Sequence, residues 1–379
     1  MASRAPTLAI LLTLAPLSSA CGDSGGQTTA DTTSTSDATT TDATSTTSDT
    51  TSTAEPTTGT SEPSTTTGEP PTTSLTSTDA TTSTTTTDPV TSTTTDGATG
   101  DDLDCVTIAP GPFTPELLAG GFDGSEDLGF DGQGGLALKR GDTVVIVTGE
   151  MLETDLAGGF PQVYGTRFAT TGELLVALPQ SGDLQAIAGD GAVTDLAGGL
   201  VSPNGLYVDP AGRVWLTEFG GSRVVRFDAQ FNKTTVYEGP MAASANGVVL
   251  DEARSLLFFT NYGAGRVLKL AVDDLGEAVG EPSEVLTVPG ARLDGLVLDQ
   301  CGNIYAVDQG GSRLFRGILD TEAALVGQPE LLAEFDSNVA NAQFGWGVGW
   351  DPESLYLSGN PGDLYRLPVG IAGAPIGLP

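Results

Sequence analysis

The sequence predicts an all-β fold, a six-bladed β-propeller, for residues 104–379. Three observations predict it. A short outer segment recurs six times, an inner strand that begins at a characteristic position recurs six times in register with it, and no repeat unit contains a convincing amphipathic helix. The repeats are 38 to 52 residues long, a length that is typical of four-stranded propeller blades rather than of helical solenoids.

The outer segments are short apolar stretches, most of which carry Gly or Pro in their last three residues. The first three share the letters Leu-Ala-Gly-Gly, and the later three are looser copies. They occupy residues 116–122, 154–160, 194–200, 235–240, 284–289 and 330–335. We expect each to form the outermost strand of a blade.

The inner strands follow several residues beyond each outer segment. Residues 293–308 show the unit best: Asp294-Gly295 precedes a short alternating strand, an Asp-x-x-Gly turn and a second strand that ends at Asp308. The aligned first positions are Glu126, Tyr164, Asn204, Asn246, Asp294 and Trp346, spaced by 38, 40, 42, 48 and 52 residues.

The order of the segments predicts how the ring closes. The first outer segment precedes the first inner strand, whereas the last unit, residues 346–367, has no outer segment after it. The N-terminal outer strand must therefore complete the last blade, which pairs sheet edges that would otherwise stay open.

The N-terminus resembles a bacterial lipoprotein signal over residues 1–20. Arg4 supplies the positive charge, residues 7–17 form an apolar stretch too short for a mature membrane helix, and small residues precede Cys21. Cys21 is the candidate lipidated residue, although Ser18 stands where such signals usually have leucine. The alternative is an ordinary secretory signal. We expect an exported bacterial outer-membrane lipoprotein, with the periplasmic or cell-surface side left open.

Residues 21–103 have the composition of a disordered acidic tether. Residues 27–100 are almost entirely Thr, Ser, Asp, Pro, Gly and Ala, with no Lys or Arg. Such a stretch cannot bury enough apolar surface to offset the entropy of ordering. It suits a stalk that lifts a folded domain off a membrane.

The charge and the missing histidine exclude several functions. Lys and Arg total 15 against 49 acidic residues, for a formal net charge of -34, which disfavours nucleic acid and anionic lipid as partners. Contact with a membrane is expected only through a lipid anchor, and the domain is expected to be a monomer. Without histidine the chain has no His-centred triad and no imidazole metal ligand.

Two further cysteines, Cys105 and Cys301, lie in the predicted folded part. In an exported protein such a pair favours a disulfide, and two buried thiols are the alternative. A bridge would tie the segment before the closing strand to a turn of the fifth unit.

The first positions of the inner strands carry the candidate chemistry. If these strands converge on one axis, Glu126, Asn204, Asn246 and Asp294 form a ring of hard oxygen ligands suited to one divalent cation, most readily Ca²⁺. The substrate would then contact Asn204, with Tyr164 and Trp346 as walls. The alternative is that Asn-Gly and Asp-Gly occur there because a turn tolerates them.

A second set of polar residues ends the second strands of three consecutive units. Glu218, Asn261 and Asp308 are predicted to return to the same mouth and contact substrate or a second cation, with a turn or capping role as the alternative. Recurring arginines after the next turn are expected to pair with nearby acids.

Three stretches together resemble the gluconolactonase, regucalcin and luciferin-regenerating family of six-bladed propellers. They are residues 202–215, residues 245–248, and residues 293–296 with 302–305. The resemblance covers the whole predicted folded part and none of the tether. It implies a divalent cation, commonly calcium, on Glu126, Asn246 and Asp294, and substrate contact by Asn204.

The first blade departs from this family. Ser125-Glu126-Asp127-Leu128 stands where the family usually has Glu-Gly-Pro, and it is similar to the paraoxonase branch instead. Paraoxonases use histidines for proton transfer, so their mechanism does not carry over to this chain.

These residues predict a metal-dependent hydrolase of sugar lactones or related small-molecule cyclic esters, with Asp294 as the base. The predicted folded part, residues 104–379, has no Gly-x-Ser-x-Gly elbow. Two alternatives stay open. One is a non-catalytic surface propeller that binds a ligand or protein partner, and the other is a strictosidine synthase-like propeller that uses Glu126 without metal.

Overall fold

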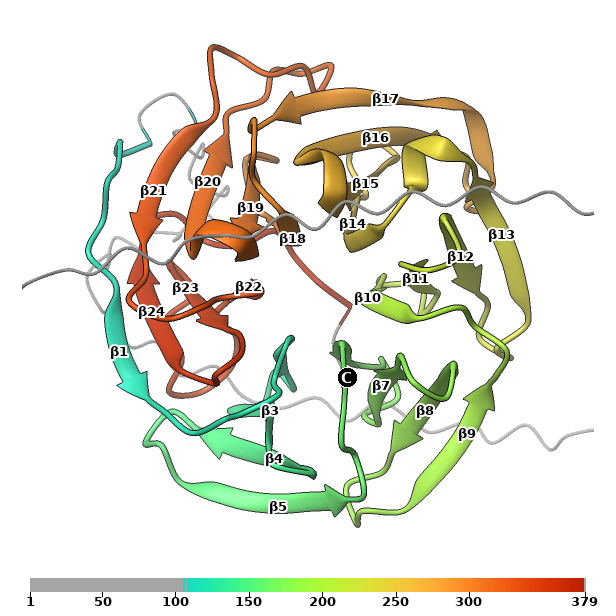
Figure 1. Cartoon of the computed structure of the whole chain (residues 1–379), viewed down its shortest axis with the longest axis vertical. Helices are drawn as coiled ribbons and strands as arrows, with labels where there is room; N and C mark the ends of the chain where they lie inside the picture. The colour runs from blue at the N-terminus through green and yellow to red at the C-terminus, as the bar shows by residue number, and fades with distance from the viewer. Residues whose placement is uncertain (1–104, 106–107, 378–379) are drawn as a thin grey trace, which may run out of the picture. The chain divides into compact units, whose positions relative to one another are not determined.

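The computed structural model describes Cys105 and residues 108–377. Within these residues, six four-stranded antiparallel sheets surround a central axis as the blades of a propeller (Figure 1). The predicted all-β, six-bladed fold is therefore confirmed. The predicted signal peptide, the lipidation site Cys21 and the tether of residues 21–103 lie outside the described residues.

In five blades the strands follow chain order from the axis to the rim. The first blade comprises β2 (Gly129–Phe130), β3 (Gly135–Arg140), β4 (Thr143–Thr148) and β5 (Glu153–Gly158), and the second β6 (Gly165–Phe168), β7 (Leu174–Leu178), β8 (Asp183–Ile187) and β9 (Val193–Ala197). The third comprises β10 (Pro203–Val208), β11 (Val214–Glu218), β12 (Arg223–Phe227) and β13 (Lys233–Glu238).

The fourth and fifth blades are built in the same way, with short 3-10 turns between some strands. The fourth comprises β14 (Ala245–Asp251), β15 (Leu256–Asn261), β16 (Arg266–Val272) and β17 (Ala278–Thr287), and the fifth β18 (Leu293–Leu298), β19 (Ile304–Asp308), β20 (Arg313–Gly317) and β21 (Glu330–Glu334). The 3-10 turns are η1 (Pro240–Ala242), η2 (Tyr262–Ala264) and η3 (Gln309–Gly311).

The sixth blade joins the two ends of the folded chain. It contains β22 (Asn341–Phe344), β23 (Ser354–Ser358) and β24 (Leu364–Pro368), and its outermost strand is β1 (Glu116–Ala119) from the N-terminal side. Glu116 lies opposite Arg366 in this antiparallel pair. The expected closure by the N-terminal outer strand is confirmed, and no blade is left without its outer edge.

Aspartates hold several of the tight turns between strands. The Asp209 side chain accepts a hydrogen bond from the Arg213 amide at 2.9 Å, and the Asp299 side chain accepts from the amides of Cys301 and Asn303 at 2.9 Å each. Gly302 completes the second of these turns with a φ of 74°. The Asp-x-x-Gly pattern is therefore explained by backbone amides that a short carboxylate can satisfy.

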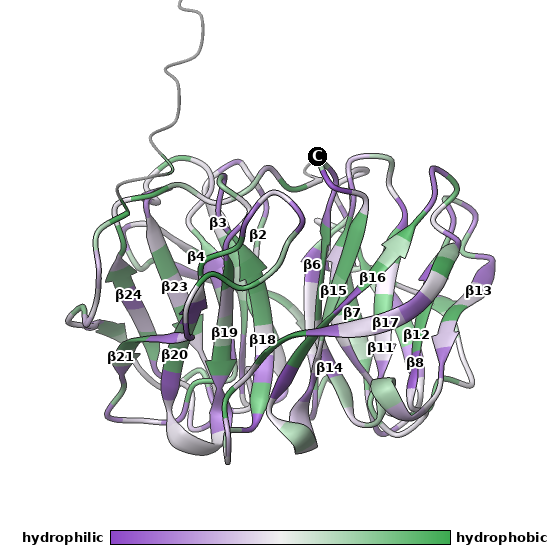
Figure 2. Ribbon diagram, turned by 90° about the horizontal axis from the view of Figure 1, so that it is seen from above, coloured by the Kyte–Doolittle hydropathy of each residue, from purple (hydrophilic) through white to green (hydrophobic). Residues whose placement is uncertain are grey.

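Apolar side chains fill the space between neighbouring blades. Val144 of the first blade and Leu174 of the second, for example, belong to one buried cluster. Figure 2 shows hydrophobic residues concentrated on the inner strands, whereas the outer strand β13 is more hydrophilic. Most side chains of β13 are exposed or half-buried. No helix in residues 108–377 is long and apolar enough to cross a membrane.

A disulfide joins Cys105 to Cys301, as the cysteine count predicts. Cys301 lies in the turn between β18 and β19, so the bridge fixes the segment that precedes β1 to the fifth blade. The two cysteines are 196 residues apart in the sequence, so the bridge closes a long loop and restricts the unfolded chain.

Candidate active site

A cavity of about 190 Å³ lies at one mouth of the central channel. Four of its lining residues are the oxygen donors predicted from the repeat, and they come from four different blades. The complete lining is Glu126, Tyr164, Ser202, Asn204, Phe219, Asn246, Tyr262, Asp294 and Gln309. The structure therefore brings together residues that are far apart in the chain and share a repeat position.

The innermost strands place these donors. Asn204, Asn246 and Asp294 are each the second residue of an innermost strand, in β10, β14 and β18 respectively. Glu126 lies in the extended segment just before β2. Because all inner strands start at the same end of the channel, their first side chains meet around the axis.

The glycine that follows each of Asn204, Asn246 and Asp294 has a packing role. A Cβ at Gly205 would overlap the carbonyl oxygen of Asn246, and a Cβ at Gly247 would overlap the carbonyl oxygen of Asp294. Neighbouring inner strands therefore approach each other too closely for any larger residue. Close packing at the axis, rather than a turn, explains the Gly of the Asn-Gly and Asp-Gly pairs.

Two threonines on the second strands hold the donors' backbone in place. The Thr260 hydroxyl accepts a hydrogen bond from the Gly247 amide at 2.8 Å and donates one to the Asp294 carbonyl oxygen at 2.9 Å. Thr217 links Gly205 to the Asn246 carbonyl oxygen in the same way. Each hydroxyl therefore bridges two adjacent blades directly behind the cavity, and sequence inspection did not identify this role.

The donor side chains themselves have no partner within the described part of the chain. Asn204, Asn246 and Asp294 are 4–5% exposed, yet no hydrogen bond from residues 108–377 reaches their side chains or that of Glu126. The polar side-chain atoms of these residues are not among the fully buried atoms that lack a partner, so they are accessible from the cavity. The arrangement thus leaves them available to a ligand.

The electrostatics of the cavity point in the same direction. Burial, with repulsion from Asp127, raises the pKa of Glu126 to about 7. Burial, with repulsion from Glu126 and Asp127, raises the pKa of Asp294 well above its usual range. Burial, with repulsion from the carboxylates of Glu126 and Asp294, raises the pKa of Tyr164. A bound cation would relieve this repulsion.

The donor set fits a hard cation. Two carboxylates and two amide carbonyls are oxygen ligands of the type that Ca²⁺ prefers, with water completing a shell of about six to eight. No group of three or more His, Cys, Asp or Glu residues in the described part of the chain converges on a common point. A cation at this mouth would therefore need the amide oxygens of Asn204 and Asn246 as ligands in addition to the two carboxylates.

Adjacent residues of the Glu-Asp pair face different partners. Glu126 lines the cavity, whereas the fully buried Asp127 accepts hydrogen bonds from the Thr166 amide at 2.8 Å and from Arg167 Nη1 at 2.5 Å. Arg167 is itself only 8% exposed. Asp127 is thus committed to an internal ion pair and does not serve the cavity.

The structure does not bring Trp346 to the ring. The innermost strand of the sixth blade is β22, which begins at Asn341, and Trp346 lies beyond its far end beside a second, apolar cavity. Asn341 occupies the ring position, where its side chain would meet a Cβ at Gly295. The repeat pattern indicated Trp346 because it is followed by a glycine, Gly347, as the ring residues of the third to fifth blades are, whereas Asn341 is followed by alanine.

Glu218, Asn261 and Asp308 do not line the cavity, and the structure gives each an internal partner. The Glu218 carboxylate accepts from the Val201 amide at 2.7 Å, and the Asp308 carboxylate accepts from the Arg292 amide at 2.8 Å. The Asn261 side chain accepts from the Ala264 amide at 3.1 Å and caps η2. The capping alternative describes these residues better than substrate contact does.

The recurring arginines also have the role expected of them. Arg223 pairs with Glu218 at 2.6 Å and Arg313 pairs with Asp308 at 2.5 Å, while Arg266 and Arg366 pair with acids on their own blades. Arg223 and Arg313 therefore hold the capping carboxylates in place, whereas Arg266 pairs with Glu284 and Arg366 with Asp351.

Four cavity residues escaped the sequence analysis: Ser202, and three that share a repeat position. Phe219, Tyr262 and Gln309 each follow directly after one of the capping residues, at the first position beyond β11, β15 and β19. Their recurrence at one repeat position was the available signal. Because side chains alternate along a strand, the residue after a buried cap turns toward the axis instead.

Comparison with known proteins places the fold. No family model matches the chain. Over 192 residues it is 29% identical to a pentonolactonase, XacC, of Haloferax volcanii; the match covers 45% of this chain and 64% of the relative. The chain thus spans less than two thirds of the length of that curated protein.

Solved structures agree on the architecture. A gluconolactonase from Xanthomonas campestris superposes with a TM-score of 0.59 at 18% identity, covering 70% of this chain and 93% of that one. A calcium-binding protein, regucalcin, from Agrobacterium tumefaciens gives 0.58 at 17% identity, covering 72% and 99%. The chain therefore shares the six-bladed propeller fold of these proteins.

Proposed function

We propose that this gluconolactonase- and regucalcin-like propeller is a divalent-cation-dependent hydrolase of sugar lactones or related cyclic esters. The observation that carries the proposal is the set of four oxygen ligands at one mouth of the channel, three of them buried and one half-buried, whose side chains have no hydrogen-bond partner within the described residues. The similarity to a pentonolactonase and a gluconolactonase supports the reaction class. A chain without histidine also needs another means of polarising a carbonyl.

The chain's own residues divide the work. Glu126, Asn246 and Asp294 would hold the cation, most readily Ca²⁺, and Asn204 would orient the substrate. When bound, the cation supplies polarisation of the lactone carbonyl and stabilisation of the oxyanion. Tyr164, whose raised pKa keeps its hydroxyl protonated, is placed to donate a hydrogen bond to the ligand.

Asp294 is the proposed proton carrier. Its carboxylate has no hydrogen-bond donor among the described residues, so one Oδ atom is free to take the proton of the attacking water. As the carbonyl carbon–ring oxygen bond breaks, the same proton passes to the ring oxygen, which leaves as a hydroxyl group. The product is the open-chain hydroxy acid.

Asp294→Asn and chelation test this mechanism. Asp294→Asn should lower kcat/KM for a pentono- or gluconolactone by about 100-fold or more, in the range usual for loss of a general base. Chelator should abolish activity, and added Ca²⁺ should restore it. Glu284→Gln, which changes an exposed carboxylate of a surface ion pair on β17, is the control and should have no effect.

The outcomes also separate the alternatives. Full activity in Asp294→Asn or in excess chelator would refute the proposal. Bound cation without hydrolysis of any cyclic ester would favour the non-catalytic propeller. Activity that survives chelation but is lost in Glu126→Gln would favour the metal-free, strictosidine synthase-like reaction.

The location of the protein is proposed separately. The Cys105–Cys301 disulfide supports export, because disulfides persist in oxidising compartments. We expect Cys21 to carry the lipid, so labelled fatty acid should be incorporated into the full chain and not into its Cys21→Ala variant. Incorporation into both would refute the assignment of Cys21.

A further inference from the structure

We infer that an aromatic shelf, formed by Phe219 and Tyr262 and held by Gln309, makes the site selective for uncharged ring substrates and against anionic ones such as lactone phosphates. The inference rests on the proposed function, because it names the substrate class of that same cavity. It depends on three observations: where the rings lie, what fixes them, and which charges line the cavity.

The two rings come from adjacent blades and reach the mouth together. Phe219 follows β11 and Tyr262 follows β15, and both are half-buried lining residues of the cavity. Their ring centroids are 5.7 Å apart with an interplanar angle of 69°, which is an edge-to-face contact. The rings therefore form one continuous apolar surface beside the oxygen donors.

Polar contacts hold this shelf in place. The Tyr262 hydroxyl donates a hydrogen bond to Gln309 Oε1 at 2.7 Å, and Asn338 Nδ2 donates to the Gln309 carbonyl oxygen at 2.6 Å. The guanidinium carbon of Arg292 lies 5.8 Å from the Tyr262 ring centroid. A surface fixed in this way loses little conformational freedom when a ligand binds.

An aromatic surface suits the C–H face of a neutral sugar ring. The faces of Phe and Tyr rings carry partial negative charge, which attracts weakly positive C–H groups. The hydroxyl groups at the edge of the same sugar ring need hydrogen-bonding groups, which Asn204, Ser202 and Gln309 provide within the lining. Stacking on one side and polar contacts on the other would orient the ring.

The charges in the lining oppose an anionic substituent. Its only charged members among the described residues are Glu126 and Asp294, and one divalent cation would balance both without leaving a net positive charge. Arg223 is engaged by Glu218 at 2.6 Å and Arg313 by Asp308 at 2.5 Å, and Arg292, which lies over the Tyr262 ring, is not a lining residue of the cavity. Within the lining a phosphate would thus lose water without gaining a cationic partner.

Binding of a ligand that cannot be hydrolysed tests this selectivity. The probes are D-glucono-δ-lactam, which replaces the ester with an amide, and its 6-phosphate, titrated calorimetrically into the Ca²⁺-loaded protein. We expect the phosphate to bind at least about 10-fold more weakly. Phe219→Ala should weaken binding of the neutral lactam by roughly 5-fold and leave Ca²⁺ affinity unchanged. Phe219→Arg should reverse the preference in favour of the phosphate.

A matched control is Phe231→Ala, which removes another half-buried ring from a turn of the third blade outside this lining. It should leave both probes unaffected. Equal or tighter binding of the phosphate, or an unchanged affinity in Phe219→Ala, would overturn the inference. If the lactam shows the expected preferences but no lactone is hydrolysed, the proposed function fails alone. If neutral and phosphorylated lactones are hydrolysed equally well, the inference fails alone.

Discussion

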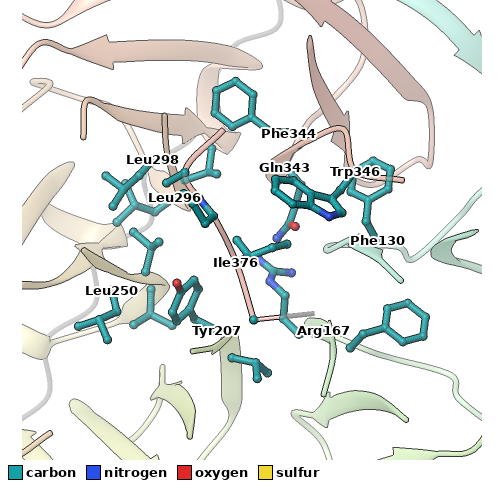
Figure 3. Close-up of a pocket in the computed structure, with 18 residues that line it drawn as sticks. Phe130, Arg167, Tyr207, Leu250, Leu296, Leu298, Gln343, Phe344, Trp346 and Ile376 are labelled. Carbon is teal, nitrogen blue, oxygen red and sulfur yellow. The ribbon is translucent and has the colours of Figure 1, made fainter. Parts of the chain in front are cut away.

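The two ends of the central channel are built from the same strands and have opposite character. At the open mouth, β14 presents Asn246, whereas further along it presents Val248 and Leu250. The apolar end encloses a cavity of only about 30 Å³ (Figure 3). Two or four residues along one strand therefore separate a position that lines the open cavity from a packed core position.

The C-terminal segment adds to this difference. The Ala374 amide donates to the Leu298 carbonyl oxygen at 3.0 Å, and the Gln300 amide donates to the Ala372 carbonyl oxygen at 2.9 Å. Ile376 then lies among the side chains that line the apolar cavity, near the centre of Figure 3. The comparison indicates that a repeated strand supplies both ends, while a non-repeated segment covers one of them.

The largest effect is expected where the two regions meet. Arg167→Met should lower the free energy of unfolding by about 4 kcal/mol, because it leaves Asp127 buried without its ion-pair partner. Denaturant unfolding measures this. Arg140→Met, which breaks the exposed pair with Glu153, should cost less than about 1 kcal/mol. Similar losses in the two variants would contradict the assignment of Arg167 as a buried structural cation.

Removal of the disulfide tests the apolar end of the channel, which the C-terminal segment covers. Replacing Cys105 and Cys301 together by serine should lower the free energy of unfolding by about 3 kcal/mol, since the bridge closes a long loop in the unfolded chain. Cation affinity at the open mouth should not change. A loss of cation binding without a loss of stability would show that the bridge supports the mouth instead.

The open mouth should make the metal-free protein sensitive to pH. The pKa of Glu126 is about 7 in the folded protein and 4.5 as its ordinary value, so the folded form binds this proton more tightly than the unfolded form. The free energy of unfolding should therefore fall as pH rises from 4.5 to 7, by about 2 kcal/mol after allowing for solvent at the mouth. The raised pKa of Asp294 acts in the same direction.

Thermal unfolding between pH 4.5 and 7.5 measures this slope. Glu126→Gln should flatten it, and saturating Ca²⁺ should flatten it in the unaltered protein because the cation neutralises the carboxylates. A metal-free protein whose stability rises over this pH range would contradict the assigned electrostatics.

The smallest effect is expected in the C-terminal segment. Ile376→Ala should lower the free energy of unfolding by about 1 kcal/mol, since the side chain is only half-buried in the apolar end. Lactone hydrolysis at the other end should be unaffected. Val348→Ala, at a side chain that is 81% exposed, serves as a control and should change neither quantity. A marked loss of activity in Ile376→Ala would mean that the two ends are coupled.

Much of the fold was predictable because its signals are local. All six outer segments form outermost strands, and the segment at residue 116 closes the ring as its position in the chain requires. Trp346 was mistaken for the ring residue of the sixth blade because Gly347 follows it. In the second to fifth blades the glycine after the ring residue reflects close packing between inner strands, whereas an alanine follows Asn341. A pattern with a packing cause is not a reliable marker of a functional position.

The number of blades, their closure and the oxygen ligands near the axis could be predicted from the chain, because strand alternation and repeat spacing are local properties. The bridge between Cys105 and Cys301, chosen over two buried thiols, needed the folded structure. So did the placement of Glu126 toward the cavity and Asp127 toward Arg167, and of Phe219 rather than Glu218 in the lining. Neighbouring residues point in opposite directions, so their roles depend on what the adjacent blade places against each one.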